Sequence, residues 1–248
     1  MWITIVGVSV LVTAFISGVF GMVGGLILMA IYLALLSVPE AMLLHGVTQL
    51  ASNGSRAFLL RDHFHWPGIR MYVVGATVGV IVFASLAISL DKATCSIALG
   101  SIPWLALMIP SRMRQWLDFT RASHAVSCGF LVTGAHLTAG VSGPLLDVFF
   151  VGGSLSRHQI VGTKALTQSI AHTTKIIYFT ALAPRAANWS DLPPYVYLVV
   201  IAMALVGTRL GRAVLDRWSD RRFLQVTRWL VLAIGAVSIV RGISTWGA

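Results

Sequence analysis

The sequence predicts an all-α integral membrane protein made of two repeats, and three observations lead to this prediction. The chain is 57% hydrophobic and only 10% charged, with a mean hydropathy of +0.84. It contains eight apolar stretches, each long enough for a membrane-spanning helix. Shifted by 119 residues, its halves also fall into register. The aligned pairs are Gly21 with Gly140, Gly24 with Gly143, Leu26 with Leu145, Ser37 with Ser156, Thr48 with Thr167, and Gln49 with Gln168.

We assign the repeats to residues 1–121 and 122–248 of one compact membrane domain. In chain order the expected helical stretches are 2–37, 41–60, 69–90, 93–110, 122–154, 160–182, 192–212 and 223–244. The first and fifth stretches are too long, because about twenty helical residues cross the hydrocarbon core. Each contains a glycine-rich interruption, at 21–25 and 140–144, so we expect the first stretch of each repeat to be broken there.

The positive charges test whether the chain turns back at these breaks. If every stretch crosses once, Lys and Arg divide almost evenly between the two sides, against the expected cytoplasmic excess. If the two long stretches turn back, three cations face one side: Lys92, Arg185 and Arg241. The twelve on the other side are Arg61, Arg70, Arg112, Arg114, Arg121, Arg157, Lys164, Arg209, Arg212, Arg217, Arg221 and Arg222. This excess favours an inverted repeat with the N-terminus outside the cytoplasm; the alternative is eight plain helices in two parallel repeats.

Composition also narrows the class of partner. The net charge of +10 comes mainly from short loops between apolar stretches, which favours a membrane surface over nucleic acid. Cys95 and Cys128 lie in apolar segments without metal-ligand spacing, so we expect no metal site, cofactor or disulfide. The start of the chain lacks the basic region of a signal peptide, and the first stretch belongs to the repeat, so we expect it to be retained.

The breaks have a chemistry of their own. Ser142 or Gly143 can cap a helix, and Pro144 suits the first helical position, so a half-helix is expected to begin there. Gly24 and Gly25 occupy the equivalent point in the first repeat. Two helix N-termini facing each other at membrane depth would bind an anion, although close helix packing is the alternative for any single glycine. The expected anion contacts at the breaks are Gly21, Gly24, Gly25, Ser142 and Gly143.

The stretch after each break carries polar residues at three- and four-residue spacing, and therefore on one helix face. A cation inside the membrane costs about 2.5 to 3.5 kcal/mol and faces a cavity or an opposite charge. Lys175 and Arg56 are both expected anion contacts, with Lys175 the stronger candidate, because Arg56 is near enough to the end of its stretch to reach the interface instead. The other expected anion contacts on this face are Thr48, Gln49, Asn53, Thr167, Gln168 and His172. The two sets are His45, Thr48, Gln49, Asn53 and Arg56, and Lys164, Thr167, Gln168, His172 and Lys175.

Four residues are candidates for proton coupling. His45, His136 and His172 titrate near neutral pH, and the alternative for each is a hydrogen bond between helices. Asp147 is the exception among carboxylates that otherwise lie near loops. We expect it in the first turn of the second half-helix, where it either carries a coupling proton or pairs with Lys175 or another cation.

Paired broken segments at equivalent places are typical of a secondary transporter whose site lies where the repeats meet. A passive anion channel is one alternative, because the same cations would also line a pore. An intramembrane serine protease is another alternative, because residues 140–143 form a GxSG pattern, and in it His172 or His136 would serve as the base. The repeat argues against the protease. Val23 stands at the position equivalent to Ser142, and a protease has no reason to duplicate the surrounding glycines and polar residues.

At these residues the chain resembles the TauE/SafE sulfite exporter family. The resemblance rests on the glycine-rich turns at 18–25 and 140–146, the pair His65 and Trp66, and the segment 162–165 with His172 and Lys175 downstream. Two departures are Val23, where the family usually has glycine, and Ala30, where proline commonly follows. Family members are usually described as having eight spans, which agrees with the charge argument only if the broken segments re-enter.

The resemblance implies a multi-pass transporter of the cytoplasmic (inner) membrane that moves sulfite or an organosulfonate outward, coupled to the proton gradient. The expected partners are a small anion and the lipid bilayer, without nucleic acid, and a homodimer is an open possibility. Physical reasoning supports an oxyanion without identifying it, because amides, hydroxyls and a lysine recognise oxyanions in general.

Overall fold

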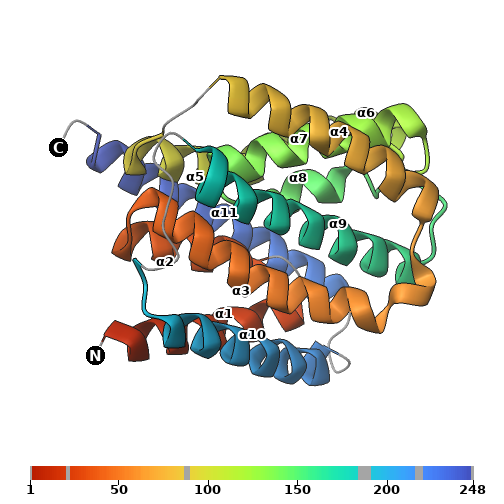
Figure 1. The fold of residues 1–248 in the computed structure, drawn as a ribbon. Coiled ribbons are helices and arrows are strands. Elements are labelled where there is room, and N and C mark those ends of the chain that lie inside the picture. Colours follow the sequence, from red (N-terminus) through yellow and green to blue (C-terminus); the bar gives the residue numbers. More distant parts are fainter. Residues whose placement is uncertain (1, 21–22, 87–89, 184–190, 216–219, 247–248) are drawn as a thin grey trace.

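The structure, a computed structural model, describes residues 2–20, 23–86, 90–183, 191–215 and 220–246. Within these residues the protein is helical throughout, and its long helices form one bundle (Figure 1). This confirms the prediction of an all-α integral membrane protein. Four described helices contain windows long and apolar enough to cross a membrane: Trp2–Val19, Trp66–Ser85, Pro194–Gly211 and Gln225–Ser244.

The helices follow the eight expected stretches closely. The first half contains α1 (Trp2–Phe20), α2 (Val23–Leu35), α3 (Val38–Leu59), a 3₁₀ turn η1 (Arg61–His63), α4 (Trp66–Ser85) and α5 (Lys92–Met108). A short helix that we did not expect, α6 (Ser111–Trp116), follows it. The second half contains α7 (Ala122–Thr138), α8 (Gly143–Val148), α9 (Arg157–Ile177), a π-helical segment η2 (Tyr178–Leu182), α10 (Pro194–Leu215) and α11 (Asp220–Ser244).

Both long stretches are broken, as predicted. In the first half α2 turns back along α1, since a Cβ added to Gly24 would lie only 1.8 Å from the backbone oxygen of Thr13. In the second half Gly140 has a φ of +76°, which favours glycine. After α8, Phe149 O accepts a hydrogen bond from Phe119 N at 2.9 Å, so this segment returns to the start of α7.

The helix that follows each broken stretch begins at an equivalent position of the two repeats. Ser37 and Ser156 are the N-caps of α3 and α9, and each forms a capping box, with Glu40 and Gln159 respectively. The serine accepts from a backbone amide while the glutamate or glutamine accepts from the serine's own amide, so two otherwise unpaired donors are satisfied. The two helices that carry the polar residues singled out from the sequence thus start in the same way.

The helix pairs that pack together occur in matched sets. Helix α1 packs on α10 and α7 packs on α4, while α3 packs on α9 and α5 on α11. In chain order α1, α3, α4 and α5 of the first half correspond to α7, α9, α10 and α11 of the second. Exchanging corresponding helices turns the α1–α10 pair into the α7–α4 pair and leaves the α3–α9 and α5–α11 pairs unchanged. Glycines allow close approach in these pairs: a Cβ at Gly75 or Gly129 would lie within about 2 Å of a backbone oxygen across the α4–α7 interface.

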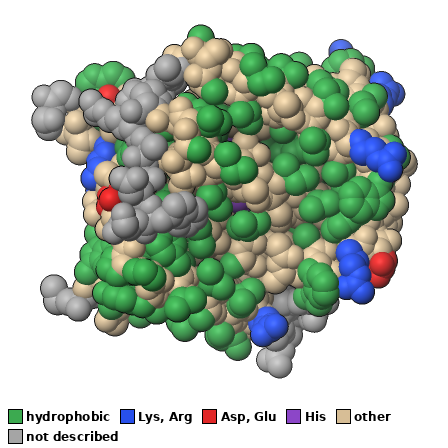
Figure 2. Space-filling model, viewed as in Figure 1, with side chains coloured by type: hydrophobic (Ala, Val, Ile, Leu, Met, Phe, Trp, Pro, Cys, Tyr) green, Lys and Arg blue, Asp and Glu red, His purple; other side chains and the backbone are tan. Residues whose placement is uncertain are grey.

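The path of the chain fixes which ends lie together. Both termini lie at one end of the bundle, and α6, which joins the halves, lies at the other (Figure 1). Lys and Arg side chains gather at the α6 end of the viewed face (Figure 2). Each half therefore starts and finishes at opposite ends, as an inverted repeat requires. The inverted relationship and its orientation in the membrane stay predictions.

Candidate functional site

A cavity lies where α2, α3 and α9 meet the break between α7 and α8, with one residue from α1. It encloses about 400 Å³ of space between atoms, counting the part open to the outside. The first half contributes Ser17, Gly25, Leu26, His45, Gln49, Asn53 and Arg56. The second half contributes Val141, Ser142, Gly143, Pro144, Gln168 and His172.

The structure brings together nine of the residues singled out from the sequence and leaves others outside the cavity lining. Those that line it are Gly25, His45, Gln49, Asn53, Arg56, Ser142, Gly143, Gln168 and His172. Those that do not are Gly24, Thr48, His136, Asp147, Thr167 and Lys175. Gly21 lies outside the described residues.

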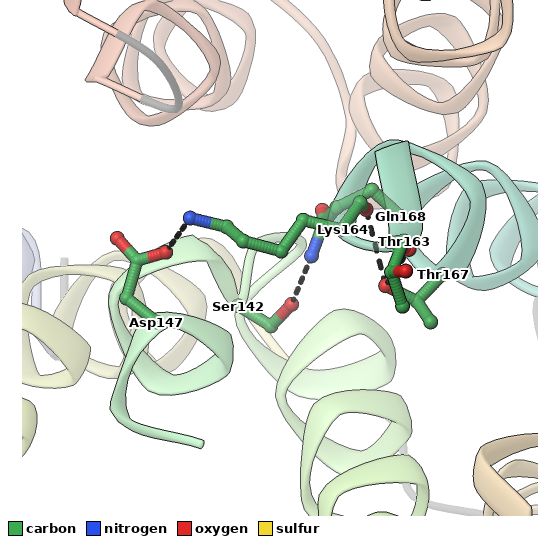
Figure 3. Close-up of polar contacts among 6 residues, drawn as sticks. All are labelled: Ser142, Asp147, Thr163, Lys164, Thr167 and Gln168. Atoms are coloured by element: carbon green, nitrogen blue, oxygen red, sulfur yellow. Dashed lines mark hydrogen bonds and ion pairs between the residues drawn. The ribbon is translucent and has the colours of Figure 1, made fainter. Parts of the chain in front are cut away.

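The start of α8 lies at the cavity wall. Ser142 occupies the N-cap position and Pro144 lies within the first two helical positions, but the Ser142 side chain makes no capping hydrogen bond. Its Oγ instead accepts from Gln168 Nε2 at 3.2 Å (Figure 3). Because a hydroxyl both donates and accepts, the Ser142 O–H is left to donate to a ligand.

The α3 wall of the cavity presents amides and a cation. Asn53 Nδ2 donates to the backbone oxygen of Gln49 at 3.1 Å and lies 3.4 Å from its Oε1. These two bonds occupy both N–H bonds of Asn53 and fix the two carboxamides relative to each other. The N–H bonds of Gln49 Nε2 are left to donate to a ligand. Arg56, one turn further along α3, is half-buried and brings a permanent positive charge to the cavity.

The side chain of Lys175 does not line the cavity, contrary to the role expected for it. It is fully enclosed, and its Nζ donates to Gly140 O at 2.9 Å. That carbonyl follows the C-terminal end of α7, where helix carbonyls lack intrahelical partners and a cation is favoured. Lys175 therefore lies at the negative end of the helix before the break rather than at the positive end of the helix after it.

Lys175 also joins the two breaks through His45. His45 Nε2 lies 2.8 Å from Gly25 O, and since a carbonyl only accepts, Nε2 is the donor. In the neutral imidazole Nδ1 is then the acceptor, and Lys175 Nζ donates to it at 2.8 Å. Three hydrogen bonds thus connect the backbone of Gly25 with the backbone of Gly140.

Three histidines cluster beside this connection. The ring of His172 lies 5.5 Å from that of His45 and 4.6 Å from that of His136, measured between centroids. His136 Nδ1 lies 3.1 Å from Val132 O and donates to it. His136 Nε2 and His172 Nδ1 are buried without a hydrogen-bond partner. Hydrogen bonding between helices was the alternative to proton coupling for these histidines. Among the three, the structure shows such a bond only for His45.

The expected position of Asp147 is wrong. Helix α8 spans only Gly143–Val148, so Asp147 lies at its C-terminal end and not in its first turn. Its carboxylate forms an ion pair with Lys164 of α9, not with Lys175, and both side chains are partly exposed (Figure 3). The pair joins α8 to α9 outside the cavity lining.

The remaining candidates have structural contacts. Thr48 Oγ1 donates to Leu44 O at 2.8 Å, and Thr167 Oγ1 donates to Thr163 O at 3.0 Å (Figure 3). These bonds occupy the hydroxyl protons within their own helices. Gly24 lies against α1, so for this glycine close packing, the alternative to anion binding, describes the observed contact.

Sequence reasoning missed four cavity residues, Leu26, Val141, Pro144 and Ser17. Ser17 had a usable signal: Thr13 and Ser17 stand four residues apart in an otherwise apolar stretch, which places two hydroxyls on one helix face. Cys95 and Cys128 are both free and buried. Within the described residues no His, Cys, Asp or Glu cluster is suited to hold a metal ion.

A family model described as Sulfite exporter TauE/SafE matches residues 5–238 of the chain. Comparison with curated proteins gives no match. Comparison with solved structures gives no match either. The comparisons give no support for a homodimer.

Proposed function

The chain belongs to the TauE/SafE sulfite exporter family, which is a family of membrane transporters and not of enzymes. We therefore propose that it exports a small sulfur-containing oxyanion across the cytoplasmic (inner) membrane. The substrate is sulfite or an organosulfonate, its movement is coupled to protons, and its site is the cavity between the two breaks. One observation carries the proposal: residues from both halves, including the start of α8, line a single cavity.

The lining supplies what an oxyanion requires. Arg56 provides charge and a planar set of N–H donors, and Ser142, Gln168 and Gln49 provide neutral donors. Asn53 holds the Gln49 carboxamide in place. Among the residues that line the cavity there is no Asp or Glu, so the ligand meets no like charge there.

Lys175 acts in this proposal as a positioning residue. Its hydrogen bonds to Gly140 O and His45 Nδ1 hold the two breaks in register, so that movement of one break is transmitted to the other. His45, His172 and His136 are the proposed proton carriers, because their rings are in contact and two of their nitrogens have no partner. Asp147 pairs with Lys164 outside the cavity and is assigned a structural role.

Purified protein in proteoliposomes tests the function directly. Sulfite flux should be saturable and should depend on an imposed pH gradient; flux that follows voltage without proton movement would instead support a channel. Arg56→Gln should weaken sulfite binding about tenfold or more, because a hydrogen bond to a charged group contributes about 1.5–3 kcal/mol.

Arg61→Gln is the matched control for that substitution. Arg61 is an exposed arginine just beyond α3, with its guanidinium 4.8 Å from the Phe58 ring centroid, and it does not line the cavity. It should bind and transport sulfite like the wild type. Equal losses in the two variants would contradict the assignment of Arg56 to the site.

A further inference from the structure

The first helix contributes to the cavity a polar side chain whose hydroxyl makes no hydrogen bond within the described protein. Ser17 of α1 lines the cavity, is only 4% exposed, and its Oγ has no hydrogen-bond partner. Thr13, one turn earlier on the same helix, donates to Ser9 O at 2.6 Å. The usual intrahelical bond of a membrane hydroxyl is therefore made at Thr13 and not at Ser17.

An unpaired buried hydroxyl is unfavourable. It costs about 1–3 kcal/mol. A protein keeps an unpaired hydroxyl where the hydroxyl serves another purpose, and binding a polar ligand in the cavity is such a purpose. The hydroxyl would be satisfied once the ligand is bound.

The neighbours of Ser17 place it beside the other donors. A Cβ added to Gly24 would lie 2.5 Å from Ser17 Oγ, so the hydroxyl lies against the first turn of α2, where backbone amides have no intrahelical acceptor. From the second half, His172 lines the same cavity, is 3% exposed and has an unpartnered Nδ1. Two unsatisfied groups from opposite halves thus share one cavity.

We propose that Ser17 is an anion-binding residue and that Ser17 and His172 bind different oxygen atoms of one oxyanion. This inference rests on the proposed function and narrows its ligand: the site takes an anion with several acceptor oxygens on one central atom and not a monatomic halide. Ser17 Oγ donates to one oxygen, and His172 Nδ1, when it carries the ring proton, donates to another.

The test is Ser17→Ala, followed by thermal unfolding in detergent with and without added sulfite, sulfate, methanesulfonate or chloride. Without ligand the variant should unfold at the same temperature as the wild type or higher, because an unpaired hydroxyl has been removed. The stabilisation by sulfite should be lost, with an apparent Kd weakened about tenfold or more. Chloride should stabilise neither protein.

Ser96→Ala is the matched control. Ser96 is similarly buried, but it does not line the cavity and its hydroxyl donates to Lys92 O at 2.7 Å. This variant should lose stability without ligand and keep the sulfite response. If Ser17→Ala behaves in the same way, Ser17 is structural and the inference is wrong.

Further outcomes separate this inference from the function. If the wild type responds to sulfite and Ser17→Ala responds equally, only the inference falls. If chloride stabilises the wild type as well as sulfite does, the oxyanion assignment falls. If none of the oxyanions stabilises the wild type, the proposed function and the inference fall together.

Discussion

Substitution of Gly24 by alanine tests the hairpin that brings α2 to the cavity. The added Cβ would lie 1.8 Å from Thr13 O, a backbone atom that cannot rotate away. Real Cβ atoms essentially never come closer than 3.0 Å, so α1 and α2 must separate by at least about 1.2 Å. Forced separation of packed elements costs about 1–3 kcal/mol, and we expect the free energy of unfolding to fall by that amount.

The same displacement should reach the site. Gly25 follows directly, and its carbonyl accepts from His45 Nε2 at 2.8 Å. A movement of about 1.2 Å along that bond would lengthen it to about 4.0 Å, beyond hydrogen-bonding distance. Sulfite flux in proteoliposomes should therefore fall together with stability.

Gly54→Ala on α3 is the control. Nothing lies within 4 Å of the Cβ it would add, and alanine in a helix interior is favoured over glycine by about 0.5–1 kcal/mol. We expect this variant to unfold at a slightly higher temperature than the wild type and to transport normally. Wild-type stability and flux in Gly24→Ala would refute the proposed packing of α2 on α1.

Two further predictions concern charged side chains near the breaks. Lys175→Met keeps the side-chain volume but leaves two buried acceptors, Gly140 O and His45 Nδ1, without donors. At about 1–3 kcal/mol for each acceptor, the free energy of unfolding should fall by about 2–6 kcal/mol. Unchanged denaturant unfolding in detergent would contradict this prediction. Asp147 and Lys164 form a partly exposed ion pair, so a double-mutant cycle with Asp147→Asn and Lys164→Met should give a coupling energy of about 0.2–1 kcal/mol. Asp147→Asn alone should keep pH-driven sulfite flux. Loss of proton-driven flux in Asp147→Asn would return Asp147 to the coupling mechanism.

Hydropathy and glycine spacing were sufficient to predict the helices and both breaks. Apolar length is a local property, and Gly140 shows why a break is readable: its positive φ suits glycine and few other residues. The serine caps at 37 and 156 also mark helix starts by local chemistry alone. The unpredicted α6 lacks such a signal, since no side chain caps its start.

The site was predicted less completely, because helical spacing gives a face but not the depth at which a cavity ends. Gln168 and His172 of α9 line the cavity, whereas Lys175, on the same stripe, lies beyond it against Gly140. The position of Asp147 depended on the length of α8, which ends after six residues. Ser17 was missed because a single serine in an apolar helix usually satisfies itself within the helix.

The enclosed Lys175 has a consequence for how the protein is assembled. The alignment of the halves pairs it with Arg56, yet Arg56 borders the ligand space while Lys175 is shut away behind His45. A symmetric dimer of two identical short chains would have to give both cations the same surroundings. A single polypeptide is free of that constraint, so its two halves can place equivalent cations in different environments.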